Sequence, residues 1–338
     1  MDTFRTWFDT RFAELLSAKI AEFQGHSPST DVATIAQYAA TLGKDGKRFR
    51  PYLVHTASGN TIETAADHFL LYASVELLHL FALIHDDIMD GADTRHGVLC
   101  AHRVFAAQYG ARTAEAVAIL LGDIVLVWAY DCLFDYTMRF PDTRDAVAGQ
   151  FKQLVSEVTH GQILDILSPV LAPQSRALIE QKMILKTGRY SFVQPLLLGF
   201  IVSGMTEQKH TFADTFGTAL GVGFQLQDDL IDLLPSSVTG KSSCGDIVSG
   251  QQTLLSWYME HEASPEHRAQ FATYRGQTTL SDTDRDSIRA LVETSGAYDF
   301  VRGEIDRYMQ QAAHAIEQYH TDTALWQQIV ELVATRKK

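Results

Sequence analysis

The sequence of 338 residues has few of the residues that interrupt or cross-link a chain. It contains eight prolines and three cysteines, Cys100, Cys132 and Cys244. The cysteines lack the spacing of metal ligands or of a disulfide framework, so we expect free thiols in a reducing cytoplasm. No Pro-, Gly- or Ser-rich tract marks a linker. The length allows two ordinary domains or one large one, and we predict a single domain over residues 1–338.

Other absences exclude whole functional classes. The net charge is −13, from 28 basic and 41 acidic residues, which disfavours nucleic acid or an anionic membrane as the main partner. Asp123 interrupts the richest apolar stretch and the N-terminus lacks a signal-peptide core, so we expect a soluble protein without stable membrane insertion. The sequence has no GxGxxG or GxxxxGK[ST] loop. It also lacks a Ser/His/Asp or Cys/His arrangement for nucleophilic catalysis.

Apolar residues instead recur at the helical spacing i, i+3, i+4 and i+7, with few alternating runs. This pattern predicts an all-α protein, a large antiparallel helical bundle whose interior site is formed by facing helices. We expect Ser29 and Thr30 to cap one helix, and Thr61 with Glu63 the fourth. The expected helices are 3–24, 30–42, 51–59, 62–92, 101–109, 111–139, 143–168, 174–203, 208–235, 250–262, 281–297, 300–320 and 322–336.

Two acidic sequences with the same spacing, HDDIMD and QDDLID, end two of the apolar stretches. Each supplies a triplet, namely Asp86, Asp87 and Asp90 in the first and Asp228, Asp229 and Asp232 in the second. The first and last aspartates of a triplet share one helix face. Their carboxylates repel one another and the negative end of the helix dipole unless cations neutralise them. Such hard oxygen ligands suit Mg²⁺.

A single acidic triplet is most simply interpreted as a solvated helix end. The second copy, with the same spacing and the same apolar residues before it, reverses this interpretation. We therefore predict that the two triplets face each other across one cavity and bind a diphosphate through shared metal ions.

Polar residues that a diphosphate would need follow in order along the chain. In the loop GKDGKRFRP, Lys47 and Arg50 can converge on one anion. His79 could donate to a phosphate or be an ordinary core histidine. Each of these residues, taken alone, is most simply interpreted as structural. Together they indicate a binding site because of their order along the chain and their closeness to the triplets. The further candidates are Arg95, His96, Lys186, Thr187, Gln225 and Lys241.

Together these motifs resemble those of the trans-isoprenyl diphosphate (polyprenyl) synthases, from about residue 40 to 260. The shared motifs are GKRFRP, HxxxLIHDDIMD with the following RxG, LGD at Gly122–Asp123, EVTHGQILD, LKTGRYSF, and FQLQDDLIDL followed by GKxxxGDI. The resemblance implies the isoprenoid synthase fold, an all-α bundle around a deep, central apolar cavity, and a homodimer.

The resemblance also implies a mechanism. Three Mg²⁺ ions held by Asp86, Asp90 and Asp228, with the neighbouring carboxylates assisting, would bind the diphosphate of an allylic substrate and favour its departure. Isopentenyl diphosphate would then attack the allylic cation in a head-to-tail 1'-4 condensation, within a cavity that excludes water. The residues implied for the allylic diphosphate are Arg95, Lys186, Thr187, Gln225 and Lys241, with Lys186 among the catalytic residues. Those implied for isopentenyl diphosphate are Lys47, Arg50 and His79.

Product length should depend on what blocks the cavity below the first triplet. In similar enzymes an aromatic residue at the position of Phe81, beside a small residue such as Ala82, goes with short products. We expect a geranylgeranyl (C20) product first and a farnesyl (C15) product second. The alternative is that Phe81 is an ordinary core residue.

Two departures from the family pattern keep other functions open. His96 replaces a usual Arg that helps to bind isopentenyl diphosphate, and Gln251 replaces a usual Lys at the allylic diphosphate. Each lost charge-assisted bond is worth about 1.5–3 kcal/mol, although a protonated His96 could restore part of the first. A terpene cyclase-like enzyme of the same fold is therefore an alternative. A regulatory subunit is another, although such subunits commonly lose triplet aspartates and this chain keeps all six.

Overall fold

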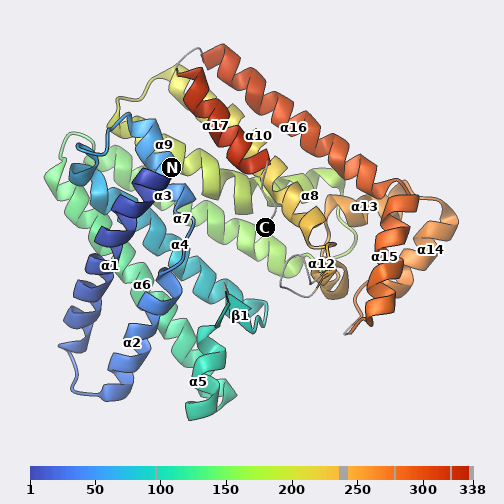
Figure 1. Ribbon diagram of the computed structural model, residues 1–338, viewed down its shortest axis with the longest axis horizontal. Coiled ribbons are helices and arrows are strands. Elements are labelled where there is room, and N and C mark those ends of the chain that lie inside the picture. The colour runs from blue at the N-terminus through green and yellow to red at the C-terminus, as the bar shows by residue number, and fades with distance from the viewer. Residues whose placement is uncertain (96, 236–242, 278, 320–321, 335–338) are drawn as a thin grey trace. The chain divides into compact units, whose positions relative to one another are not determined.

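The computed structural model describes residues 1–95, 97–235, 243–277, 279–319 and 322–334, and these residues are almost entirely helical (Figure 1). The elements of the N-terminal part are α1 (Asp2–Gln24), α2 (Thr30–Gly43), α3 (Phe49–Ser58), the 3₁₀ turn η1 (Ala65–His68), α4 (Phe69–Met89), β1 (Thr94–Arg95), β2 (Val98–Leu99), α5 (Ala101–Tyr109) and α6 (Ala111–Arg139). Then follow α7 (Arg144–Leu167), α8 (Arg176–Met183), the π-helix η2 (Ile184–Val193), α9 (Gln194–Val202) and α10 (Glu207–Ile231). The remaining elements are α12 (Gly245–Ser249), α13 (Leu254–His261), α14 (Pro265–Tyr274), α15 (Asp282–Thr294), α16 (Ala297–Tyr319) and α17 (Thr323–Ala334). The predicted all-α class is confirmed.

The chain divides into two compact units. The first unit comprises Met1–Phe151 and Leu198–Gly204, and the second comprises Lys152–Leu197 and Met205–Lys338. The single domain over residues 1–338 remains a prediction.

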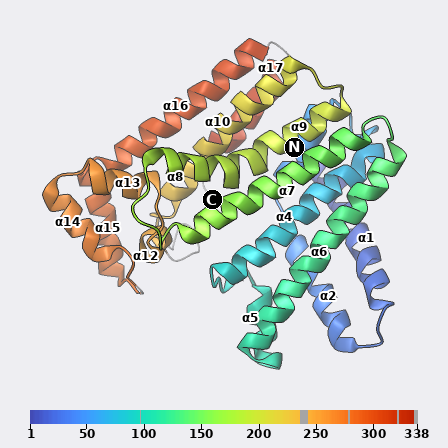
Figure 2. The same cartoon turned by 180° about the vertical axis from the view of Figure 1, so that it is seen from behind.

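The core of the first unit is built on α1, α4 and α6. Phe4, Phe8 and Phe12 recur every fourth residue along α1, so they form one buried stripe on the helix, and successive rings lie 5.7 and 5.3 Å apart. Helices α4 and α6 run side by side in both views (Figures 1 and 2). Burying a large apolar side chain contributes about 1.5–3 kcal/mol, so these packed helices hold the end of α4, with the first triplet, in a fixed position.

The core of the second unit is built on α10, which packs against α16 and η2 (Figure 2). A Cβ atom on Gly221 of α10 would lie 2.2 Å from the Cα of Gly188 in η2. Only glycine allows two backbones to approach this closely. The contact places the LKTGRYSF sequence of η2 directly beside the helix that carries the second triplet.

Several helix boundaries differ from the predictions. The predicted helix 174–203 contains a π-helical segment between α8 and α9, and helix 62–92 begins only at Phe69, after a 3₁₀ turn. Residues 250–262 contain only the shorter α13. The short antiparallel strands β1 and β2, the helix α14 and the single-turn helix α12 were not predicted.

Of the two predicted caps, one is confirmed. The Ser29 hydroxyl accepts a hydrogen bond from the Val32 amide at 3.4 Å, at the start of α2. The cap at Thr61 is wrong, because its amide donates to the Thr64 hydroxyl in a turn that precedes η1. Local turn formation competes with helix initiation at such residues.

Two helical stretches, Ala65–Met89 and Ala111–Arg139, are long and apolar enough to cross a membrane by composition alone. Core helices of soluble proteins meet the same criterion, and 56% of the most apolar part of the first stretch is buried inside the protein. These stretches are therefore weak evidence for a membrane span.

Candidate active site

The first triplet ends α4 and contains an ion pair. Asp87 is 2% exposed, whereas Asp86 is half-buried and Asp90 is exposed. Arg95, in the β-hairpin that follows, donates from Nε to Asp87 Oδ1 at 2.7 Å and lies 3.5 Å from Asp86 Oδ2. The middle carboxylate of this triplet is thus neutralised by the protein, while the outer two lie where solvent reaches them.

The second triplet ends α10 and has the same pattern of burial. Asp229 is 8% exposed, and Asp228 and Asp232 are half-buried. Gln225 Nε2 donates to Asp229 Oδ1 at 3.0 Å, and Gln225 Oε1 accepts from the Thr187 hydroxyl at 2.6 Å. Burial, together with the nearby charges of Asp228 and Asp232, raises the pKa of Asp229 to about 7. Thr187 and Gln225 are therefore brought to the second triplet, as predicted from their sequence.

Asp232 has a structural role besides its predicted role as a metal ligand. Its two carboxylate oxygens accept from the amides of Gly245 and Asp246, each at 3.1 Å, so it fixes the start of α12. This contact places the GDI sequence beside the second triplet. Burial, followed by repulsion from Asp229, Asp232 and Asp165, raises the pKa of Asp246 well above its usual value.

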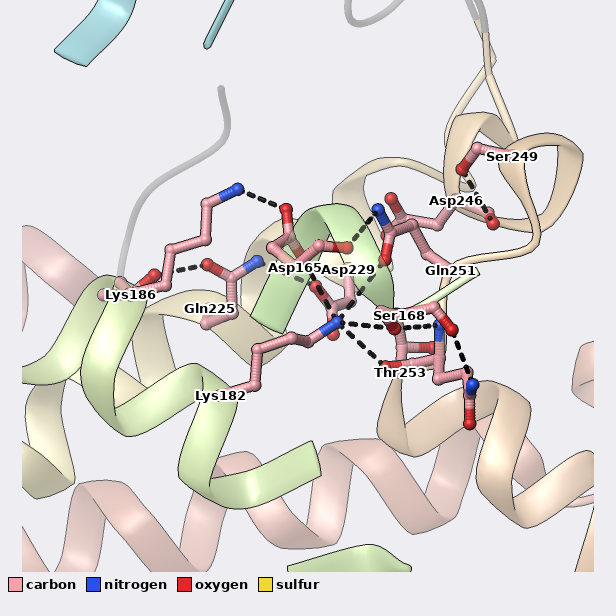
Figure 3. A network of polar contacts seen from close by, with 12 residues as sticks. Asp165, Ser168, Lys182, Lys186, Gln225, Asp229, Asp246, Ser249, Gln251 and Thr253 are labelled. Atoms are coloured by element: carbon pink, nitrogen blue, oxygen red, sulfur yellow. Dashed lines mark hydrogen bonds and ion pairs between the residues drawn. The ribbon is translucent and has the colours of Figure 1, made fainter. Parts of the chain in front are cut away.

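Lys186 extends from η2 to the end of α7 (Figure 3). Its ammonium group forms an ion pair with Asp165, the last residue of EVTHGQILD. A Cβ atom at Gly161 would lie 2.5 Å from the Lys186 amide nitrogen, so glycine is required for this helix to touch η2. A second lysine, Lys182, lies 3.2 Å from the other oxygen of Asp165. Lys182 was not predicted as a site residue, because nothing in its local sequence distinguishes it from a solvated lysine.

The GKRFRP loop is fixed by Arg48, another residue that the sequence analysis did not single out. Arg48 is 4% exposed and has a positive φ of 54°. Its guanidinium lies 2.6 Å from Asp9 Oδ1 and 2.7 Å from Glu76 Oε1. Its neighbours Lys47, which is exposed, and Arg50, which is half-buried, are the predicted substrate-binding residues. The buried arginine holds the backbone between them.

His79, Phe81 and Ala82 lie half-buried on α4. The Phe81 ring packs against His85, with centroids 4.6 Å apart. A Cβ atom at Gly122 would lie 2.3 Å from this imidazole, which explains the glycine in the LGD motif. The role of Phe81 and Ala82 in product length remains a prediction.

The predicted site residues fall into two groups. The first triplet, Lys47, Arg50, His79 and Arg95 belong to the first unit, and the second triplet, Lys186, Thr187 and Gln225 belong to the second. His96 and Lys241 lie outside the described residues. That the two triplets face each other remains a prediction.

The donor chemistry of both triplets fits Mg²⁺. Over the described parts of the chain, no three His, Cys, Asp or Glu side chains converge closely enough to form a complete metal site. Mg²⁺ usually takes one or two carboxylates from the protein and completes its coordination shell with water and substrate phosphates. Burial and, after it, acidic neighbours raise the pKa values of Asp229 and Asp246, and a bound cation would stabilise their charged forms.

Comparisons with known proteins agree with these features. A family model described as Polyprenyl synthetase matches residues 31–293. The farnesyl diphosphate synthase of Escherichia coli is 30% identical over 281 residues, which cover 79% of this chain and 85% of that protein. The geranylgeranyl diphosphate synthase of Methanosarcina mazei is 26% identical, with 80% and 79% covered. The crystal structure of a geranylgeranyl pyrophosphate synthase from Corynebacterium glutamicum, complexed with isoprenyl diphosphate and magnesium, matches with a TM-score of 0.82 at 26% identity, with 98% of each chain covered.

Proposed function

The chain belongs to the polyprenyl synthetase family and is a trans-prenyltransferase, and we propose that it condenses isopentenyl diphosphate head-to-tail with an allylic diphosphate. The product is a short trans-polyprenyl diphosphate, C20 in preference to C15. The observation that carries the proposal is the repeated triplet, in which the middle aspartate is buried and the outer two are accessible in both copies. Two matched pairs of accessible carboxylates are what a metal-bound diphosphate requires.

The accessible aspartates of both triplets would hold divalent metal ions, proposed as three Mg²⁺, whose positive charge would stabilise the departing diphosphate. Asp86, Asp90 and Asp228 have this role. Lys186 and Thr187 orient the allylic diphosphate from η2, and Gln225 is held for the same task by Thr187. Precise placement of these donors contributes more to the rate than their number does.

Isopentenyl diphosphate is assigned to Lys47, Arg50 and His79, with His96 as a further candidate. Arg95, which pairs with Asp87, is assigned to the allylic diphosphate. The position of Arg48 supports the assignment of isopentenyl diphosphate, because its pairs with Asp9 and Glu76 fix the backbone beside Lys47 and Arg50. Water must be excluded from the apolar cavity proposed between the triplets, since it would capture the allylic cation. Phe81 and Ala82 are proposed as the floor that limits chain length.

We also propose a cytoplasmic homodimer. The three cysteines are free and buried, in keeping with a reducing compartment. In α6, the large apolar residues Leu120, Val127 and Phe134 recur every seven residues and are exposed by 64%, 50% and 65%. A contiguous apolar face of this kind is typical of a surface that is buried on association.

Product analysis tests the function. The protein is incubated with Mg²⁺, isopentenyl diphosphate and dimethylallyl, geranyl or farnesyl diphosphate, and the products are dephosphorylated and separated. Elongated prenyl alcohols, ending at C20, are expected. Cyclic hydrocarbons formed without isopentenyl diphosphate would instead identify a cyclase, and no turnover with any starter would identify a regulatory subunit.

A further inference from the structure

Lys182 is a buried cation for which the proposed reaction has so far no role. It lies near the end of α8, is 6% exposed, and its ammonium group lies at the centre of a polar network (Figure 3). Its Nζ lies 3.2 Å from Asp165 Oδ1, 3.3 Å from Ser168 Oγ, 3.1 Å from the Gln252 carbonyl oxygen and 3.4 Å from Gln251 Oε1. Lysines are rarely buried unless they are paired, so this one is held by oxygen atoms of two other segments of the second unit.

Asp165 connects Lys182 to Lys186. One of its carboxylate oxygens faces Lys182, and the other forms the ion pair with Lys186. Although burial alone would raise the pKa of Asp165, the two lysines lower it below its usual value, so the carboxylate is charged. Because this single negative charge is divided between two ammonium groups, Asp165 binds Lys186 less tightly than it would bind it alone.

Gln251 is the other partner of Lys182 that bears on its role. Its Oε1 accepts from Lys182, and its Nε2 donates to the main-chain oxygen of Asp165 at 3.4 Å. The family pattern has a lysine at this position. A lysine at 251 in this chain would bring a second ammonium group against Lys182. The cation beside residue 251 therefore extends from α8, as Lys182, and not from the segment before α13.

We propose that Lys182 is a positioning residue for the diphosphate, which supplies the positive charge that position 251 lacks and presents Lys186 to the substrate. The proposal rests on the function proposed above and extends it to an allylic diphosphate bound in the second unit. Without the charge of Lys182, Asp165 pairs with Lys186 alone and competes with the diphosphate for it. Lys182 need not touch the substrate to have this effect.

The first experiment measures binding of inorganic pyrophosphate with Mg²⁺ to the full chain by calorimetry, beside steady-state kinetics. Lys182→Gln keeps a polar side chain and removes the charge. It should weaken pyrophosphate binding about tenfold, the value of one charge-assisted bond, and raise KM for the allylic diphosphate more than it lowers kcat. Lys152→Gln makes the same change at an exposed lysine of α7 and should leave both quantities unchanged. Equal binding by wild type and folded Lys182→Gln would overturn the proposal.

The second experiment tests whether a positive charge at position 251 can replace the one at position 182. Gln251→Lys should restore pyrophosphate binding to Lys182→Gln, whereas Gln251→Lys alone should not tighten binding, because it adds a second ammonium group. Thermal melting without Mg²⁺ reports folding separately. If Lys182→Gln does not fold, the double variant is compared with wild type, and weak binding by a folded double variant overturns the proposal.

The proposed synthase function can be refuted independently of the positioning role of Lys182. Wild-type protein that binds pyrophosphate through Lys182 but makes no prenyl product would exclude the synthase and leave the positioning role intact.

Discussion

The two aspartate motifs are alike in sequence and burial, but the protein treats their middle carboxylates differently. Asp87 is ion-paired with Arg95, which is contributed by the hairpin that follows its helix. Asp229 accepts its hydrogen bond from the neutral amide of Gln225, and its pKa is raised to about 7. The middle carboxylate of the first motif is thus paired with a cation, whereas that of the second accepts from a neutral amide and its charged form is disfavoured by burial.

This difference extends to the surroundings of each motif. The first unit pairs its buried cations closely, as Arg48 with Asp9 and Glu76 shows. In the second unit, Asp246 adds a further carboxylate whose pKa is raised by burial and by its acidic neighbours. Asp87 is thus held in place by the protein alone, whereas the charged forms of Asp229 and Asp246, which burial disfavours, would gain most from a bound cation.

The largest expected effect is the loss of catalysis when the first aspartate of either motif is replaced. Asp86→Ala and Asp228→Ala should each lower kcat/KM by about 1,000-fold, since metal stabilisation of a leaving group is worth several kcal/mol. Steady-state assays with isopentenyl and farnesyl diphosphates measure this loss. Full activity of either variant would remove that triplet from the mechanism.

Replacement of the middle aspartate should change the stability of the protein differently in the two motifs. Asp87→Asn leaves Arg95 with only its longer ion pair, 3.5 Å from Asp86, and should lower the free energy of unfolding by about 2 kcal/mol. This loss is below the value for a fully buried pair because Arg95 is partly exposed and keeps this second partner. Asp229→Asn removes a charge that burial disfavours, so metal-free protein should not be destabilised. Urea unfolding in the presence of chelator measures the free energy of unfolding of each variant. Equal losses would contradict the comparison.

The tight pairing of Arg48 gives the next prediction. A Cβ atom at Gly46 would lie 2.2 Å from the Arg48 guanidinium and 2.9 Å from Glu76 Oε1. Gly46→Ala should therefore cost about 2 kcal/mol of stability through overpacking. Gly303→Ala is the matched control, because no atom lies within 4 Å of a Cβ at this helical position. It should be neutral or stabilise by up to about 1 kcal/mol, and thermal melting compares the two.

The smallest expected effect is the pH dependence of stability that arises from His55, a buried histidine of the first unit. Burial, followed by the charges of the N-terminus and of His68, lowers the pKa of His55 to about 4 from 6.5. The unfolded chain then binds a proton that the folded chain does not, so stability falls as the pH drops from 6.5 toward 4. At pH 5 the loss should be about 1–2 kcal/mol. His55→Gln should reduce this pH dependence in urea unfolding, and an unchanged dependence would assign it to other groups.

The sequence predicted those parts of the fold and site that depend on local pattern. The apolar spacing placed long helices before both triplets, and α4 and α10 indeed end within them. Ser29 was recognisable as a cap because its partner is three residues away. The order of the candidates along the chain predicted that they lie close to the aspartate triplets, and Thr187 and Gln225 do lie beside the second triplet.

The remaining features depend on contacts between distant segments. Arg48 meets Asp9 and Glu76, which lie 39 and 28 residues away, so its burial has no local signal. The π-helix forms where Gly188 meets Gly221 of α10, a packing that periodicity does not reveal. Lys182 likewise acquires its environment from α7 and from the segment that follows α12.

Removal of metal tests the central claim most directly. Product formation from isopentenyl and farnesyl diphosphates is followed with Mg²⁺, with excess chelator, and after Mg²⁺ is restored. The account predicts that the elongated prenyl diphosphate disappears in chelator and returns with Mg²⁺. Elongation that continues unchanged in chelator would contradict it.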